Sequence, residues 1–310
     1  MNNLRPIDQH QIRINELITT FILAQDIKPS SKKQYEGSLR QYFAWVEEKQ
    51  YDLSQITRTE ILQYKQDLLN SGMSALTIGA YLCAVRKFYE WAEGMKEYPN
   101  VSKGIKSPKR KNAFRKQPLT PDPCRELLTY FQGQTLRDYA IINLLLRCGL
   151  RTIEVVRANI GDIKFKGGQR VLMVQGKGWD DRDSFVCLTE ACFKPISDYL
   201  KTRGRYRPTE PLFAAESNNN RGNRLTTQSI SYMAKRGLRA IGLDDRTITA
   251  HSLRHTCAVN ILRAGGTLQD AQNVLRHMAV TTTQLYISSL NESSRLEKPA
   301  EQLLDAVYQL

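Results

Sequence analysis

The sequence lacks the features that mark several classes of protein. Its six cysteines include no Cys-x-x-Cys pair, and neither a His/Cys spacing nor a carboxylate cluster typical of metal ligands is present. It has no long apolar run of the kind that spans a membrane, and it has no signal-peptide pattern. We therefore expect a cytoplasmic protein in a reducing setting, with no membrane association and no bound metal.

The composition fits a globular protein of two domains. The chain has 310 residues, of which 41% are hydrophobic and 25% are charged, and these values exclude large-scale disorder. Basic residues exceed acidic ones by 14, and the pI is about 9.5. A surplus of this size usually serves a polyanion, most often nucleic acid.

The positive charge is concentrated in one segment. Residues 1–100 contain equal numbers of basic and acidic side chains, whereas residues 101–118 contain no acidic residue and half of the net charge. Its basic residues are Lys103, Lys106, Lys109, Arg110, Lys111, Arg115 and Lys116. The segment has no apolar period, which indicates a linker. This linker is either a solvated tether or a segment that crosses a DNA backbone, and we favour the second alternative.

Four amphipathic helices are expected before this linker. Apolar residues recur at helical spacing over residues 10–25, and again after Ser30 and Ser31, which are good N-cap types. Thr57 to Glu60 forms a capping box for a third helix that should end near Gly72, and a fourth helix should run from Ser74 to Gly94. Four helices with short connections predict a bundle.

The second half is expected to be mostly helical with a small antiparallel sheet. Strands are predicted at 160–165, 171–175 and 184–188, separated by glycine-containing turns. Helices are predicted at 121–132, 136–148, 190–202, 227–240, 251–264, 267–277 and 281–288. The predicted fold class is therefore mainly α (α+β). The predicted divisions are a helical domain over 1–102, a basic linker over 103–118, a second domain over 119–290 and a C-terminal helix over 291–310.

The C-terminal helix carries an apolar stripe through Ala300, Leu303, Leu304, Val307 and Leu310. Such a stripe can dock on its own domain or in the groove of a neighbouring copy, and both alternatives stay open here.

The chemistry-bearing residues gather between positions 251 and 286. Three of the four histidines, two arginines and a tyrosine lie in His251-Ser252-Leu253-Arg254-His255 and in the stretch from Leu275 to Tyr286. Arginine forks match phosphate oxygens, imidazoles transfer protons, and a tyrosyl oxygen can attack phosphorus. His251 and His255 could also be mistaken for metal ligands, but no third ligand follows at a suitable spacing. The cluster indicates a centre that holds one phosphate group.

Two upstream motifs belong with these residues: Cys148-Gly149-Leu150-Arg151-Thr152-Ile153-Glu154 and Gly176-Lys177-Gly178. Together they resemble the tyrosine recombinase (phage integrase) family, and most closely its two-domain, Xer-type members. The first motif is similar to the family's first arginine box, and the second stands where the family has a hairpin lysine. His251 to His255 matches the His-x-x-Arg box, and His277 precedes Tyr286 by nine residues, as the family pattern expects.

The resemblance implies an N-terminal core-binding (SAM-like) bundle and a catalytic domain that together clamp duplex DNA. It also implies a site-specific recombinase that works through a 3′-phosphotyrosyl intermediate without a cofactor, as a homotetramer on two duplexes or with a heterologous protomer. The implied catalytic residues are Arg151, Lys177, His251, Arg254, His277 and Tyr286, and Glu154 and His255 are expected to support them.

Elementary chemistry gives each implied role a reason. Arg151 and Arg254 would stabilise the charge that grows on the phosphate oxygens. Lys177 would protonate the leaving 5′ oxygen, and His251 is the nearest base to help Tyr286 ionise, because a free tyrosine has a pKa of about 10. His277 would donate to a non-bridging oxygen. One departure stands out: the family usually has glycine before this histidine, and the chain has Arg276. Either the local backbone differs or an extra cation faces phosphate.

Residues that contact DNA are harder to place. Besides the basic residues of the linker, the candidates are Lys32, Lys33, Arg40, Lys235, Arg236 and Arg239. Two other functions remain open: a type IB topoisomerase, which relaxes supercoils with similar residues, and a DNA-binding regulator without turnover. The sequence does not identify the target site, the accessory proteins, or the choice between integration, excision and dimer resolution.

Overall fold

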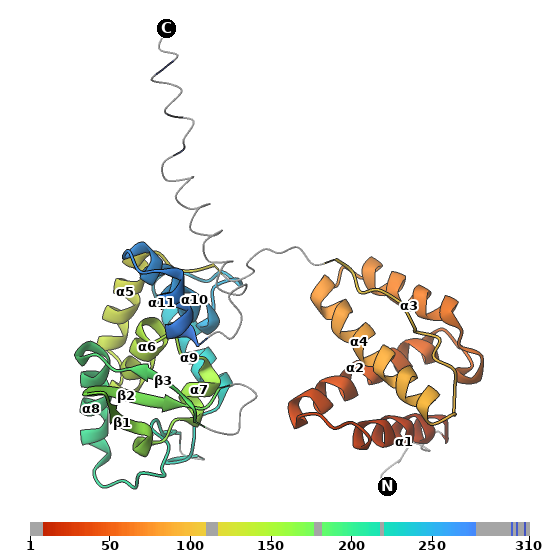
Figure 1. Cartoon of the computed structure of the whole chain (residues 1–310), viewed down its shortest axis with the longest axis horizontal. Helices are drawn as coiled ribbons and strands as arrows, with labels where there is room; N and C mark the ends of the chain where they lie inside the picture. The colour runs from red at the N-terminus through yellow and green to blue at the C-terminus, as the bar shows by residue number, and fades with distance from the viewer. Residues whose placement is uncertain are drawn as a thin grey trace, which may run out of the picture. The chain divides into compact units, whose positions relative to one another are not determined.

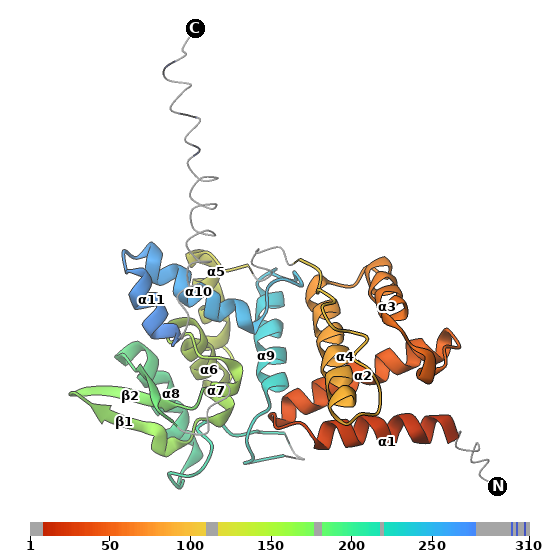
Figure 2. The same ribbon diagram turned by 45° about the vertical axis from the view of Figure 1, so that its right-hand side comes forward.

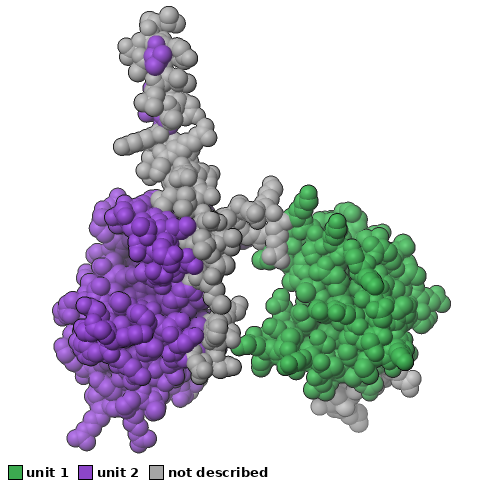
Figure 3. Space-filling model, in the orientation of Figure 1, with its two compact units in different colours: residues 1–112 green, residues 113–310 purple. Residues whose placement is uncertain are grey.

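The computed structural model describes residues 9–109, 117–176, 182–217 and 220–276, together with residues 299, 302 and 307. The chain divides into two compact units, residues 1–112 and 113–310, which are coloured separately in Figure 3. The described helices and the small sheet confirm the predicted fold class. None of the helices in these ranges is long and apolar enough to cross a membrane.

Unit 1 is a helical bundle (Figure 1). Its helices are α1 (Gln9–Leu23), α2 (Pro29–Glu48), α3 (Arg58–Asn70) and α4 (Ala75–Gly94), with a short 3-10 helix at Leu53–Gln55. The predicted capping box is present, since the Glu60 carboxylate accepts from the Thr57 amide at 2.7 Å. Ser74 also caps α4 as predicted. The predicted start of α2 is wrong: Lys28 is its N-cap, because Pro29 has a fixed φ suited to the first helical position.

Aromatic side chains fill the core of unit 1. Phe21, Tyr42 and Tyr64 are fully buried, and the hydroxyl groups of Tyr42 and Tyr89 lie 2.7 Å apart. The start of the basic segment also packs here. Ile105 is buried, and its carbonyl accepts from Arg86 at 2.8 Å. The exposed residues Lys103, Lys106 and Lys109 are therefore displayed from a stretch whose backbone is fixed on the bundle.

Unit 2 surrounds a central helix with other helices and a sheet (Figures 1 and 2). Its elements are α5 (Pro121–Gln132), α6 (Leu136–Arg147), α7 (Thr152–Arg157), a 3-10 helix (Ile160–Asp162), β1 (Ile163–Lys166), β2 (Gln169–Val174), β3 (Ser184–Cys187), α8 (Glu190–Arg203), α9 (Thr227–Ala240), α10 (Ala250–Arg263) and α11 (Leu268–Leu275). Helix α6 is buried along most of its length and packs against α5, α8 and α10. The predicted helix at 281–288 lies outside the described residues.

The sheet is antiparallel in the order β1-β2-β3, with Leu172 of β2 opposite Ile163 and Val186. The strand predicted to begin at Ile160 begins three residues later. The Asp162 carboxylate accepts from the Asn159 amide at 2.7 Å, and this bond closes a 3-10 turn where the apolar pattern alone indicated a strand.

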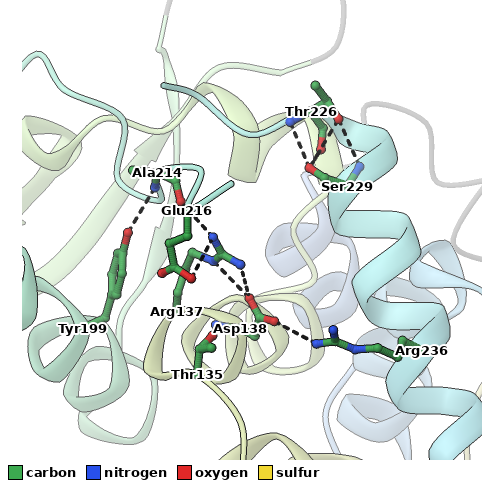
Figure 4. A network of polar contacts seen from close by, with 9 residues as sticks. All are labelled: Thr135, Arg137, Asp138, Tyr199, Ala214, Glu216, Thr226, Ser229 and Arg236. Carbon is green, nitrogen blue, oxygen red and sulfur yellow. Dashed lines mark hydrogen bonds and ion pairs between the residues drawn. The ribbon is translucent and has the colours of Figure 1, made fainter. Parts of the chain in front are cut away.

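A buried carboxylate ties α6 to α9 (Figure 4). Asp138 is 3% exposed and pairs with Arg137 at 2.8 Å and with Arg236 of α9 at 3.2 Å. Arg137 also donates to the carbonyl of Ala214 at 3.1 Å. The network fixes α9 beside the centre of the unit.

Candidate active site

The turn between α6 and α7 brings the first arginine box into position. Gly149 has a φ of +56°, and a Cβ at this position would lie 2.6 Å from Leu275 Cδ2. Only glycine meets both demands, because the left-handed conformation and the close approach each disfavour a side chain. The turn after α6 can therefore lie directly against the end of α11.

Arg151 is the N-cap residue of α7, and Glu154 occupies the third helical position. The Glu154 carboxylate accepts from the Arg151 amide at 2.7 Å and from Arg151 Nη1 at 2.8 Å. Both bonds run from Arg151 to Glu154, so the carboxylate three residues after the arginine fixes its orientation. Glu154 is 1% exposed, whereas the Arg151 side chain is 29% exposed. Arg151 is therefore fixed by the buried carboxylate of Glu154, while part of its side chain remains exposed to solvent.

Arg254 comes from α10 and meets the same group. Its Nη1 donates to the carbonyl of Gly149, its Nη2 donates to the carbonyl of Leu275, and Nη1 lies 3.8 Å from Glu154 Oε2. Only 2% of the Arg254 side chain is exposed. The second arginine therefore joins the turn before α7, the second turn of α10 and the end of α11.

Arg276 is the third guanidinium at this place. It ends α11 with φ 54° and ψ 46°, the left-handed conformation in which glycine is common. Its Nη2 donates to Glu154 Oε2 at 2.7 Å, and its Nη1 donates to the carbonyl of Val274 at 2.6 Å. The glycine-like backbone is thus kept, and the arginine side chain turns toward Glu154.

Opposing effects set the ionisation of Glu154. Burial favours the neutral acid, but Arg276, Arg254 and Arg151 together with the Arg151 amide hold the pKa of Glu154 below its ordinary value. The carboxylate is therefore ionised at neutral pH. One negative charge facing three guanidinium groups leaves this set of four side chains with a net charge of +2, which suits an anionic ligand.

The hairpin between β2 and β3 is anchored at both ends. Arg157, on the last turn of α7, donates to the carbonyl of Gly176 at 3.1 Å. Arg182 pairs with Asp162 at 2.8 Å and donates to the carbonyl of Arg157 at 3.2 Å. Lys177 itself lies outside the described residues. The contacts connect Gly176 and Arg182, the described residues on either side of it, to the same short helix that begins after Arg151 and carries Glu154.

The two histidines of the His-x-x-Arg box lie on the first turns of α10. The His251 side chain is exposed and His255 is buried, with their ring centroids 4.5 Å apart. Within the described ranges, no group of three or more histidine, cysteine or carboxylate side chains is arranged to hold a metal ion. His277 and Tyr286 lie outside these ranges.

Several of the basic residues that were expected to contact DNA form hydrogen bonds or ion pairs within the protein. Lys235 donates to the carbonyl of Asp245 at 2.6 Å, Arg239 pairs with Asp244 at 2.8 Å, and Arg236 pairs with Asp138 (Figure 4). Arg40 pairs with Glu36 at 3.0 Å, and Lys33 is exposed. Arg110, Lys111, Arg115 and Lys116 lie outside the described residues. The structure therefore brings together Arg151, Glu154 and Arg254, but within the described ranges it gathers no comparable cluster from the expected DNA contacts.

One residue that shapes this site is not predicted from the sequence, and the role of a second is left open there. Arg157 is not among the predicted site residues, although its position one turn after Glu154 on a short helix is an available signal. Arg276 stands out in the sequence only as a departure from the family pattern. Its partner Glu154 could not be inferred, because the contact spans α7 and α11 and depends on the tertiary fold.

Comparison with known proteins places this site in a family. A sequence model of the phage integrase family matches residues 117–293, and a model of the phage integrase N-terminal SAM-like domain matches residues 14–96. The first match covers more than half of the chain. The chain belongs to the phage integrase family. Because members of this family are tyrosine recombinases, the protein is a DNA strand-transfer enzyme.

Curated relatives of this recombinase carry consistent names. The tyrosine recombinase XerC of Pelobacter propionicus is 30% identical over 268 residues, which cover 84% of this chain and 85% of the relative. The XerC of Caldanaerobacter subterraneus is 38% identical over 172 residues, covering 54% of this chain and 46% of that protein.

A solved structure shares the fold. A crystal structure of the XerH site-specific recombinase, described as bound to a palindromic difH substrate after cleavage, matches with a TM-score of 0.74. The match covers 97% of this recombinase and 92% of XerH at 18% identity. At this identity the match supports the fold, and the DNA-bound state is a property of XerH.

Proposed function

We propose that this recombinase cleaves and rejoins DNA at specific core sites, using Tyr286 as the nucleophile. The supporting observation is the convergence of Arg151 and Arg254, from separate parts of the chain, on the buried carboxylate of Glu154. Convergent guanidinium groups with one shared counter-ion suit a phosphodiester whose negative charge grows during attack.

In the proposed reaction the DNA phosphate stays covalently linked to Tyr286 between cleavage and rejoining. The Tyr286 oxygen attacks phosphorus and loses its proton to His251, while the bond to the 5′ oxygen breaks and Lys177 protonates that oxygen. His277 donates to a non-bridging oxygen, and Glu154 and His255 position the groups around them. The 5′ hydroxyl of a partner strand then reverses the attack, so the phosphodiester is re-formed without a cofactor.

We further propose the partners and the setting. The core-binding domain of residues 1–102, the basic segment 103–118 and the catalytic domain of residues 119–290 each contact the DNA. Exchange takes place in the cytoplasm between two duplexes held by a homotetramer, or by a tetramer with a heterologous protomer. The outcome is integration or excision of a mobile element, or resolution of replicon dimers.

A two-plasmid assay tests this function. Sites are first selected from a random DNA pool by binding to the full chain, and pairs of selected sites are then placed on supercoiled plasmids. We expect joined products whose junctions fall inside the selected site, and no joined product from the Tyr286→Phe variant. Supercoil relaxation without any joined product would contradict recombination and favour a topoisomerase.

A further inference from the structure

Arg276 adopts a backbone conformation that is costly for an arginine. Its φ of 54° lies in the left-handed region, where a Cβ crowds the following carbonyl oxygen. Glycine would avoid this cost. In addition, the buried Nε of Arg276 has no hydrogen-bond partner among the described residues, which is a further cost. The position therefore has an arginine despite two local costs.

The side chain is placed for a specific contact. It is 9% exposed, which is far less than the 29% of Arg151, and it donates to Glu154 Oε2 at 2.7 Å. The amide of Arg151 donates to the same oxygen at 2.7 Å. With these two donors in place, Arg254 Nη1 lies 3.8 Å away, which is beyond hydrogen-bond distance, and donates to the Gly149 carbonyl instead.

The contact changes the charge available to a ligand. If residue 276 were glycine, Glu154 would face two guanidinium groups, and the group would carry a net charge of +1. With Arg276 the net charge is +2, and the negative charge of Glu154 is spread over three cations rather than two. A phosphodiester carries one negative charge, and a five-coordinate phosphorus formed by attack of an oxyanion carries two.

We propose that Arg276 is a positioning residue for the recombination reaction, which neutralises Glu154 so that Arg151 and Arg254 act on the scissile phosphate with their full charge. The inference rests on the proposed function and adds to it a third guanidinium group that acts through Glu154. Because Arg276 acts through this carboxylate, its loss should slow cleavage less than the 10²- to 10³-fold loss typical of a donor that contacts the reacting oxygen.

Two substrates separate a charge role from a purely structural one. Each is a nicked suicide duplex containing a selected site, with either a normal phosphodiester or a neutral methylphosphonate at the scissile position. The rate of covalent adduct formation is measured for wild type, Arg276→Gly and Arg276→Lys, and thermal unfolding verifies that each variant is folded. Lys96→Gly is the matched control, because Lys96 is an exposed basic residue with a φ of 59° in unit 1.

On the phosphodiester we expect Arg276→Gly to be slower than wild type by about 10- to 100-fold, and Arg276→Lys to recover part of that loss. On the methylphosphonate the cleavage rates of wild type and Arg276→Gly should differ by less than about threefold, because the transition state carries one negative charge fewer. Lys96→Gly should match wild type on both substrates.

An equal loss on both substrates would show a structural role for Arg276 and overturn the inference, as would an unchanged rate on the phosphodiester. Failure of the proposed function gives a different result: wild type would form no adduct, or the adduct would survive Tyr286→Phe. Either result would overturn the inference together with its premise.

Discussion

At the scale of single residues, Glu154 connects the parts of the site. It lies at 1% exposure among guanidinium groups from α10, from the end of α11 and from the start of its own helix. Removing one member of a buried charge cluster leaves the others uncompensated, which costs more than the interaction itself contributes. The stability of unit 2 should therefore depend on this carboxylate.

Glu154→Gln should lower the free energy of unfolding by about 3 to 5 kcal/mol at pH 7, because three cations lose their shared anion. Since the folded-state pKa of Glu154 lies below its ordinary value, its contribution is complete above the unfolded-state pKa and is lost as pH falls through the folded-state pKa. Urea unfolding of both proteins between pH 7 and pH 3 measures this. The difference between them should shrink on acidification, and a constant difference would contradict the assignment.

Gly149→Ala should also be destabilising. The left-handed backbone costs an alanine about 1 to 2 kcal/mol, and overpacking against Leu275 adds about 1 to 3 kcal/mol. Gly167→Ala is a suitable control, because its φ is also +56° but nothing lies within 4 Å of the position that its Cβ would take. Thermal unfolding of the two variants should separate the crowding cost from the backbone cost. Equal losses of stability in the two variants would show that the Leu275 side chain moves aside without a measurable cost.

Glu154 lies one helical turn after Arg151, so spacing alone predicts that it pairs with a nearby cation. The sequence brings Arg254 to the same place only through the family resemblance, because Arg254 is far from both residues in the chain and residue spacing carries no information about such a contact. The same reason explains Arg276. A left-handed arginine is unexpected from propensity, and its partner emerges only when α11 packs against the turn at Gly149.

At the scale of secondary structure elements, α7 links two parts of the site that the sequence treats as independent motifs. Its first turn carries Glu154, and its last turn carries Arg157, which donates to the carbonyl of Gly176 just before Lys177. A helix of six residues is too short for a periodic signal, so the sequence does not predict it as an element. Longer helices such as α4 are predicted with both ends correct, because capping and glycine signals mark them.

Arg157→Ala should reduce the cleavage rate about tenfold, because the segment that carries Lys177 loses one of its anchors, while DNA affinity changes little. The measurement is single-turnover adduct formation at saturating protein. Arg125→Ala is the control, because Arg125 is highly exposed and pairs locally with Asp122 in α5. A loss of affinity without a loss of rate would instead assign Arg157 to DNA binding.

At the scale of the whole molecule, charge distribution and fold lead to the same interpretation. Half of the excess of 14 positive charges lies within residues 101–118, and Ile105 fixes the start of this stretch on unit 1 with Lys103, Lys106 and Lys109 exposed. The two-part organisation and helical fold were predictable from pattern and composition. The target sequence was not, because base recognition depends on contacts that no spacing in the chain encodes.

Replacing Lys103, Lys106 and Lys109 together by glutamine should weaken binding to specific and random DNA alike. Each lost phosphate contact should reduce the slope of log affinity against log salt by about 0.9. Titrations at several salt concentrations with both kinds of DNA check this. A selective loss of specific binding would show that these lysines read bases.

Truncation before Ser293 should leave DNA binding intact and weaken synapsis, if the apolar stripe of the tail docks in a neighbouring protomer. Sedimentation of the protein with paired sites measures the assembly. Unchanged tetramer formation by the truncated chain would place the tail on its own domain.

The most direct test of the account is to locate the covalent bond. The full chain is incubated with a nicked suicide duplex carrying a selected site, digested with protease, and the DNA-linked peptide is sequenced by mass spectrometry. We expect a 3′-phosphate esterified to the side chain of Tyr286 and no linked peptide from Tyr286→Phe. A bond to any other residue, or a phosphate retained on the 5′ end, would contradict it.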